Sequence, residues 1–287
     1  MTKILDRQAQ YTLDDLRYLM GRLREPDTGC PWDIKQDFTS IAPSTIEESY
    51  ELADAILRKD YSDVKEECGD VLFQVIYYAE LGSELPAGER FDWRDIVHAL
   101  VNKLIRRHPH VFPEGRLYQR NLNGGITESE QSSRWEQSKA LERSKKGLSG
   151  FFDDIPQGLP AASRAKKMQK RAAQVGFDWP CVEGVLDKLE EELAELKEAI
   201  VDYQQDQTTS SENRKAHVAE ELGDVFFTMV NLSRHLKIDF DITAMQSNQK
   251  FASRFESMLT LIEQEGVDIK ELESLEWESY WRKVKMQ

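Results

Sequence analysis

The chain has 287 residues, of which 40% are hydrophobic and 31% are charged, and this composition predicts a globular protein with one large domain or two ordinary ones. Its formal net charge of −14 opposes sequence-independent binding to nucleic-acid phosphates and to anionic membrane surfaces. No segment is apolar over the length of a membrane-spanning helix, and the N-terminal residues lack the apolar core of a signal peptide. We therefore expect no membrane partner, and the negative charge leads us to expect no nucleic-acid partner.

Apolar residues at helical spacing predict helices over residues 44–57, 63–81 and 92–107 in the first half of the chain. Ser44 or Thr45, directly after Pro43, is expected to cap the first of these helices, and Ser62 the second. The segment "HPHVFPEG" contains two prolines and ends the pattern after the third helix.

The second half predicts helices over 160–174, 182–204, 213–236, 241–265 and 268–286. The polar, glycine-containing stretch "PEGRLYQRNLNGGITESEQSS" predicts a linker, followed by a short charged helix near 134–146. Because no run alternates as a strand would, the expected fold class is all-α. We expect an N-terminal module at 1–115, a linker at 116–155 and a C-terminal module at 156–287.

Two motifs occur twice and indicate that the modules are copies of each other. "IEESYEL" at 46–52 resembles "EEELAEL" at 190–196, 144 positions later, and "EECGDVLFQV" at 66–75 resembles "EELGDVFFTM" at 220–229, 154 positions later. The ten extra residues in the second copy fall in the polar stretch 202–214, which predicts a longer loop. "GCPWD" at 29–33 and "GFDW" at 176–179 form a looser pair.

The repeated motifs place carboxylates three residues apart, on one face of a helix. If the two helices of each module pack antiparallel, the pairs converge as Glu48, Glu51, Glu67 and Asp70 in the first module and Glu192, Glu195, Glu221 and Asp224 in the second. Four carboxylates near an apolar core need a counter-charge, and ligands that are all oxygen favour Mg²⁺, or Mn²⁺, over zinc.

Two other interpretations of the acids are weaker. A solvated acidic face is common in acidic chains, but it does not explain why Gly69 and Gly223 accompany the acids in both copies, since glycine destabilises a helix by roughly 1 kcal/mol relative to alanine. A glycine there suggests close approach of another backbone or a ligand. A di-iron centre needs Glu-x-x-His, and none of the five histidines has a glutamate three residues before it.

Basic side chains lie near the acidic motifs and would complete a phosphate site. Lys250 and Arg254 are four residues apart on one predicted face, as are Lys103 and Arg107 in the first module. A solvent-exposed role is the ordinary interpretation of each pair alone. Their repetition beside the acids favours phosphate binding by Lys250 and Arg254.

These motifs resemble those of the MazG family of nucleoside triphosphate pyrophosphohydrolases, in the long form with two tandem modules. The resemblance covers nearly the whole chain, through "GCPWD", "EESYELADAI", "EECGDVLFQV", "RRHPHVF", "VGFDW", "EEELAEL", "EELGDVFF" and the terminal "WRKVK". It implies Mg²⁺ bound by the paired carboxylates and release of pyrophosphate from nucleoside triphosphates. Residues expected to contact the nucleotide are Lys188, Glu191, Lys250, Arg254, Trp281 and Lys285.

The resemblance also implies turnover mainly in the C-terminal module, with a structural or regulatory N-terminal module. The segments 71–81 and 225–236 are too uniformly apolar for solvent-exposed helices, and we therefore expect a homodimer that completes a four-helix core. Lys250 and Arg254 would stabilise the leaving pyrophosphate, and either Glu191 or Glu220 would orient the attacking water. The alternatives are a non-catalytic nucleotide-binding regulatory protein and a metal-dependent hydrolase of another phosphorylated molecule.

The three cysteines, Cys30, Cys68 and Cys181, are odd in number, far apart and without a Cys-x-x-Cys pair. They support neither a disulfide framework nor a zinc site, and they fit the expected reducing cytoplasm.

Overall fold

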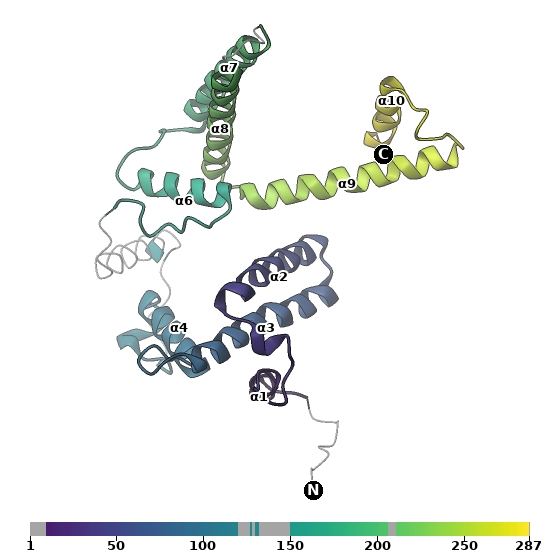
Figure 1. Ribbon diagram of the computed structural model, residues 1–287. Helices are drawn as coiled ribbons and strands as arrows, with labels where there is room; N and C mark the ends of the chain where they lie inside the picture. Colours follow the sequence, from purple (N-terminus) through teal and green to yellow (C-terminus); the bar gives the residue numbers. More distant parts are fainter. Residues whose placement is uncertain (1–9, 120–126, 128–129, 132–149, 206–210, 287) are drawn as a thin grey trace. The chain divides into compact units, whose positions relative to one another are not determined.

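The computed structural model describes residues 10–119, 127, 130–131, 150–205 and 211–286, so the charged helix expected near 134–146 lies outside the described residues. The chain divides into two compact units, Met1–Glu142 and Arg143–Gln287 (Figure 1). Within the described ranges all regular structure is helical, and the prediction of an all-α fold is confirmed. None of these helices is both long enough and apolar enough to cross a membrane. The module boundaries at 115 and 156 stay predictions.

The first unit is built around α3, which contacts the other long helices of the unit. Its elements are α1 (Leu13–Leu23), η1 (Asp33–Lys35), α2 (Phe38–Arg58), α3 (Tyr61–Glu84), α4 (Trp93–Arg107) and η2 (Pro113–Gly115). Only Lys59 and Asp60 separate α2 from α3, and Lys59 adopts a left-handed conformation with φ of 60°. This tight connection makes the two helices pack antiparallel along each other.

Two helices of this unit begin before their predicted caps. The side chain of Asp37 accepts hydrogen bonds from the N–H groups of Thr39 and Ser40, so α2 begins at Phe38 and contains Pro43. The predicted start at Ser44 or Thr45 is therefore wrong. The helix continues through Pro43 because it tolerates the loss of the one backbone hydrogen bond that a proline cannot donate. Asp60 likewise caps α3 in place of Ser62, because its carboxylate reaches two free N–H groups of the first turn.

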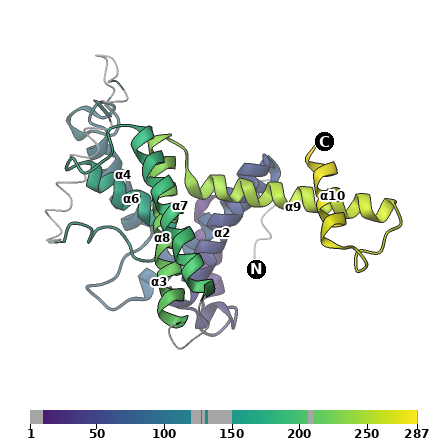
Figure 2. The ribbon, with the colours of Figure 1, turned by 90° about the horizontal axis from the view of Figure 1, so that it is seen from above.

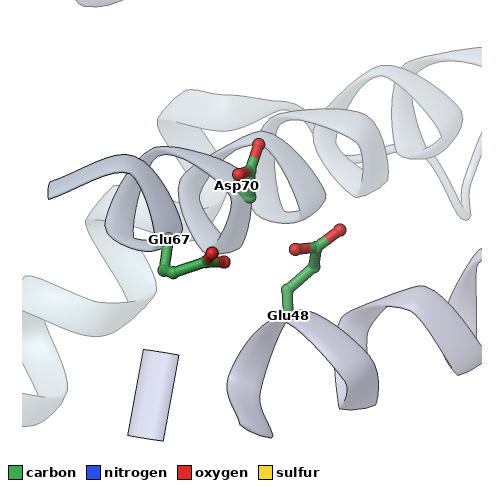
Figure 3. A group of neighbouring side chains, drawn as sticks. All are labelled: Glu48, Glu67 and Asp70. Atoms are coloured by element: carbon green, nitrogen blue, oxygen red, sulfur yellow. The ribbon is translucent and has the colours of Figure 1, made fainter. Parts of the chain in front are cut away.

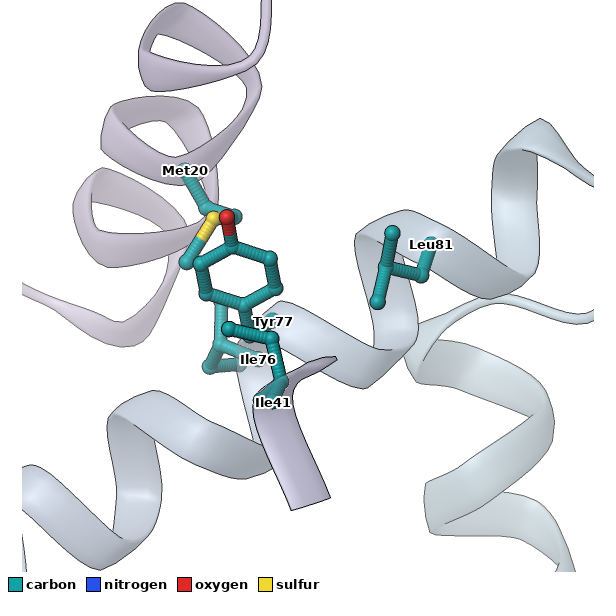
Figure 4. Close-up of a cluster of buried hydrophobic side chains, with 5 residues drawn as sticks. All are labelled: Met20, Ile41, Ile76, Tyr77 and Leu81. Carbon is teal, nitrogen blue, oxygen red and sulfur yellow. The ribbon is translucent and has the colours of Figure 1, made fainter. Parts of the chain in front are cut away.

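The buried core of the first unit lies between α1, the start of α2 and the C-terminal half of α3. It consists of Met20, Ile41, Ile76, Tyr77 and Leu81, each 5% exposed or less (Figure 4). Burying such side chains stabilises the fold by roughly 1.5–3 kcal/mol each. The core therefore fixes α2 and α3 at one end of their contact, and the acidic residues follow towards the other end.

The second unit repeats the helix pair and adds two further helices. Its elements are α6 (Ala161–Ala173), α7 (Val182–Gln205), α8 (Ser211–His235), α9 (Phe240–Gln264) and α10 (Ser274–Lys285). α7 packs along α8, and α6 crosses α8 where Ala162 and Ala165 meet Val230. Figures 1 and 2 both show α9 leading away from the α7–α8 pair, with α10 packed at its far end around Met258, Ile262 and Tyr280.

The ten extra residues of the second copy are not simply a loop. α7 continues to Gln205 and α8 begins at Ser211, so residues 202–205 and 211–214 are helical. The stretch contains no glycine or proline, and each helix therefore continues past the point where its counterpart in the first unit ends or begins.

The repeated glycines lie on exposed parts of α3 and α8. A Cβ atom built on Gly69 or on Gly223 meets nothing within 4 Å in the described structure. The close approach that these glycines suggest is therefore not made by the described residues of the same chain.

Candidate metal and nucleotide site

In the first unit, Glu48 of α2 and Glu67 and Asp70 of α3 point towards one another across the helix pair (Figure 3). Each offers a carboxylate oxygen that lies within 4.8 Å of the others. The helical spacing places Glu67 and Asp70 on one face, and the tight α2–α3 connection brings Glu48 opposite them. The predicted convergence of the acidic motifs therefore occurs for three of the four residues, and Glu51 lies outside this group.

The pKa values of these carboxyls show that the group is short of positive charge. Burial raises the pKa of Glu48, and the neighbouring Asp70, Glu51 and Glu67 raise it further. Burial also raises the pKa of Glu67, and among its acidic neighbours Glu51 adds most to this rise. One carboxylate oxygen of Glu67, Oε2, is buried and has no hydrogen-bond partner in the described structure. A divalent cation would supply both the missing charge and a partner for this oxygen.

The second unit gathers Glu192 and Glu195 of α7 with Glu221 of α8, again with one carboxylate oxygen of each within 4.8 Å of the others. Glu192 is only 6% exposed, which is rare for a glutamate unless a cation faces it. Asp224, the fourth predicted ligand, lies outside this group. The donor set is carboxylate oxygen throughout and therefore fits a hard cation such as Mg²⁺.

Two cationic or titratable side chains distinguish the second group from the first. The ammonium of Lys188 lies 2.8 Å from Glu191 and 3.0 Å from Glu192, and Nδ1 of His217 lies 3.4 Å from Glu221. The predicted nearness of Lys188 to the acids is thus present, whereas the contact of His217 was not foreseen. In the first unit, the residue equivalent to Lys188 is Ser44, 144 positions earlier, and the residue equivalent to His217 is Asp63, 154 positions earlier.

Burial raises the pKa of Glu195, and Lys188 opposes that rise, while Glu192 and Glu221 add to it. The bonds to Glu191 and Glu192 in turn raise the pKa of Lys188. The second group is therefore partly neutralised by its own lysine before any metal binds.

The structure does not bring the other predicted nucleotide contacts to the acids of the same chain. Lys250 and Arg254 lie on α9, and Trp281 and Lys285 lie on α10, which packs against the far half of α9. There the ring of Trp281 lies 5.5 Å from that of Phe251. These residues form a surface of their own, with aromatic rings beside basic side chains.

Paired helices that bring carboxylates together define a class of all-α proteins with a candidate metal site between two helices. The chain belongs to the MazG nucleotide pyrophosphohydrolase family, whose domain model matches it twice, at residues 36–112 and 182–259. The resemblance to the two-module form is thereby confirmed.

Curated relatives match almost the whole chain. It is 41% identical to the nucleoside triphosphate pyrophosphohydrolase of Escherichia coli K12, over 96% of this chain and 97% of the relative. It is 39% identical to the nucleoside triphosphate pyrophosphohydrolase/pyrophosphatase MazG of Thermotoga maritima, over 97% and 98%. An uncharacterized protein of Bacillus subtilis, YabN, is 34% identical over 98% of this chain and 53% of its own length.

Replacing Glu48 by glutamine is expected to raise the melting temperature of the metal-free protein at pH 7 by a few degrees. A carboxyl whose pKa is raised by folding destabilises the folded state once it ionises, so stability falls as pH rises above the ordinary carboxyl pKa of about 4.3. The gain should vanish near pH 4. Mg²⁺ should stabilise the original chain more than the variant, because it binds the folded state.

Differential scanning fluorimetry with EDTA and with Mg²⁺ measures both effects. The exposed neighbour Glu47, replaced by glutamine, is the matched control and should change neither curve. A Glu48→Gln variant that is less stable than the original chain without metal would contradict this account of the charge.

Proposed function

We propose that this protein hydrolyses nucleoside triphosphates to nucleoside monophosphate and pyrophosphate, with Mg²⁺ or Mn²⁺ held by the carboxylates of α7 and α8. The observation that carries the proposal is the buried Glu192 facing Glu195 and Glu221, in a chain that belongs to the MazG family. Relatives that carry the name nucleoside triphosphate pyrophosphohydrolase match over nearly their full length, which supports the same substrates here.

When bound, the metal would neutralise triphosphate oxygens and lower the pKa of a water molecule. Glu192, Glu195, Glu221 and the nearby Asp224 would hold it. Lys188 forms salt bridges with Glu191 and Glu192 in the described structure. Its ammonium could exchange these contacts for a phosphate of the substrate. Because it lies within one turn of helix of the metal ligands and beside Lys188 in the described structure, Glu191 is favoured over Glu220 for orienting the attacking water.

Turnover is assigned mainly to the second unit. Lys188 and His217 supply cationic or titratable groups beside its carboxylates, whereas the corresponding Ser44 and Asp63 leave the first group without such help. Glu48, Glu51, Glu67 and Asp70 are then a second metal site whose role is structural or regulatory.

A homodimer is the second part of the proposal, because one chain leaves apolar faces uncovered. Exposed apolar side chains on α7 and α8 include Val201, Leu222 and Met229, of which Leu222 is 58% exposed. Phe251 on α9 is also 58% exposed, beside Lys250. Exposed apolar side chains on adjacent helices are typical of a protein interface. A second copy would cover it and would bring Lys250, Arg254, Trp281 and Lys285 to the carboxylates of α7 and α8.

Product analysis tests the proposed reaction. With Mg²⁺, a panel of nucleoside triphosphates should give equal amounts of monophosphate and pyrophosphate by phosphorus NMR, and excess EDTA should stop the reaction. A nucleotide-binding regulatory protein would bind the panel and release no product. Release of diphosphate and orthophosphate would contradict the proposed bond cleavage.

A further inference from the structure

The ammonium of Lys188 already supplies positive charge to the carboxylates of the second unit. It lies 2.8 Å from Oε1 of Glu191 and 3.0 Å from Oε1 of Glu192. The side chain of Glu192 is only 8% exposed and that of Lys188 is 31% exposed, so the ammonium, more than water, balances this carboxylate. Hydrogen bonds between two charged groups are among the strongest in proteins. A metal that approaches Glu192 therefore meets an ammonium on the same carboxylate.

The place of Lys188 on α7 keeps its ammonium at the acids. Lys188 precedes Glu192 by four residues and Glu195 by seven, so the three side chains share one face of the helix. The two salt bridges also raise the pKa of Lys188, and the lysine therefore stays charged throughout the neutral pH range. Like charges repel at close range, most strongly where the site is shielded from water. The lysine therefore opposes any divalent cation that binds these carboxylates alone.

A triphosphate reverses this opposition. Lysine carries a compact charge on a flexible stem, and it binds phosphate oxygens as well as carboxylates. When its ammonium turns from Glu192 to a phosphate, the carboxylate is released for the metal, and the phosphates offer further oxygen ligands to the same ion. The metal and the triphosphate then each favour binding of the other, and this coupling is reciprocal.

The first group of carboxylates lacks such a counter-charge. The place of the lysine is taken by Ser44, which is uncharged. Every charged neighbour that shifts the pKa of Glu48 or Glu67 is itself an acid and raises that pKa. Arg58, at the end of α2, pairs with three other acids, Asp54, Asp60 and Asp63. Within the described ranges, a divalent cation at this group therefore relieves repulsion among acids without displacing an ammonium.

We propose that Lys188 makes metal binding in the second unit depend on the triphosphate, whereas the first unit binds a divalent cation without any nucleotide. The inference rests on the proposed function and deepens it, since it gives the order in which the same site is filled. The second unit completes its metal site only when substrate is present. The first unit keeps its metal between turnovers, as a structural site does.

Exchanging the two equivalent residues tests the inference. The electron paramagnetic resonance signal of free Mn²⁺ measures binding of the metal alone and needs no turnover. In the original chain, tight binding should belong to the first unit and survive Glu192→Gln with Glu195→Gln, and the second unit should bind at least about tenfold more weakly. Lys188→Ser should tighten Mn²⁺ binding by the second unit at least about tenfold, and Ser44→Lys should weaken binding by the first unit to a similar extent.

The coupling between metal and triphosphate is a second readout. Calorimetry gives the affinity for a non-hydrolysable nucleoside triphosphate with Mn²⁺ and with EDTA, and the Mn²⁺ complex of the free nucleotide cancels when two chains are compared. The enhancement of nucleotide affinity by Mn²⁺ should fall at least about fivefold in Lys188→Ser. Lys197→Ser is the matched control, since Lys197 is an exposed lysine on the same helix, and it should change neither measurement.

Unchanged or weaker Mn²⁺ binding in Lys188→Ser would overturn the inference, as would an enhancement by Mn²⁺ that this variant leaves intact. Equally tight binding of Mn²⁺ by both units of the original chain, without nucleotide, would overturn it too. Failure of the proposed function is a different result, in which the original chain releases no pyrophosphate from any nucleoside triphosphate, whatever its affinity for Mn²⁺.

Discussion

Glu192→Gln combined with Glu195→Gln is expected to reduce nucleoside triphosphate turnover by at least about a thousandfold. Both carboxylates belong to the group that would hold the metal, and Glu192 is buried against it. Glutamine keeps the size of the side chain but removes its negative charge and replaces one acceptor oxygen by an NH2 donor. Losing metal-based stabilisation of about 4 kcal/mol corresponds to this factor in rate. Steady-state release of pyrophosphate measures it.

Glu48→Gln combined with Glu51→Gln is the matched variant in the first unit, where the motif has the same spacing. It should retain most of the turnover, because the first group lacks counterparts of Lys188 and His217. Circular dichroism should show that both double variants keep their helical content. Equal loss of turnover in the two variants would show that both units are catalytic.

Mixing two inactive variants is expected to restore about a quarter of the original activity. One variant carries Glu192→Gln with Glu195→Gln, and the other carries Lys250→Ala with Arg254→Ala. If the basic residues act on the partner's carboxylates, each mixed dimer has one intact site, and random exchange makes half of the dimers mixed. The expectation follows from the placement of Lys250 and Arg254 on α9, away from the carboxylates of their own chain.

Light scattering should first give about twice the chain mass of 33.2 kDa for each variant. Subunits should then be exchanged at low concentration and assayed after concentration. No recovery in dimers that have exchanged would mean that acids and bases of the same chain act together, and the proposed dimer arrangement would be wrong. A monomer that turns over substrate would contradict it as well.

The helices could be predicted from the sequence where apolar periodicity and capping residues agree. α4 begins at Trp93 after the cap Asp92 and ends at Arg107, within a residue of the prediction. α1 was not predicted, although Thr12 and Asp15 form a capping box at its start. α2 was predicted to start too late because Pro43 suggested a boundary, and the earlier cap at Asp37 was overlooked.

The carboxylate groups followed from the repeated spacing, since residues three apart on paired helices converge wherever the helices pack. Spacing did not separate Asp224 from the three acids that gather in the second unit, because this depends on side-chain direction. The contact of His217 with Glu221 has a sequence signal, an i to i+4 pair on one helix. It was missed because the histidine has no copy in the first unit.

The salt bridges of Lys188 have a sequence signal of the same kind, since Glu191 and Glu192 follow it by three and four residues. Spacing alone could not predict that the ammonium lies on these acids, because a lysine on a helix can equally extend into solvent. Comparing Lys188 with Ser44 at the offset of 144 gives a signal that the two carboxylate groups differ in charge.

The position of the bound metal tests the central claim most directly. A crystal of the full chain with Mn²⁺ and a non-hydrolysable nucleoside triphosphate should show an anomalous peak within about 2.0–2.4 Å of carboxylate oxygens of Glu192, Glu195 and Glu221. The triphosphate should share that metal. A nucleotide whose phosphates lie away from these carboxylates, with no metal between them, would contradict the account.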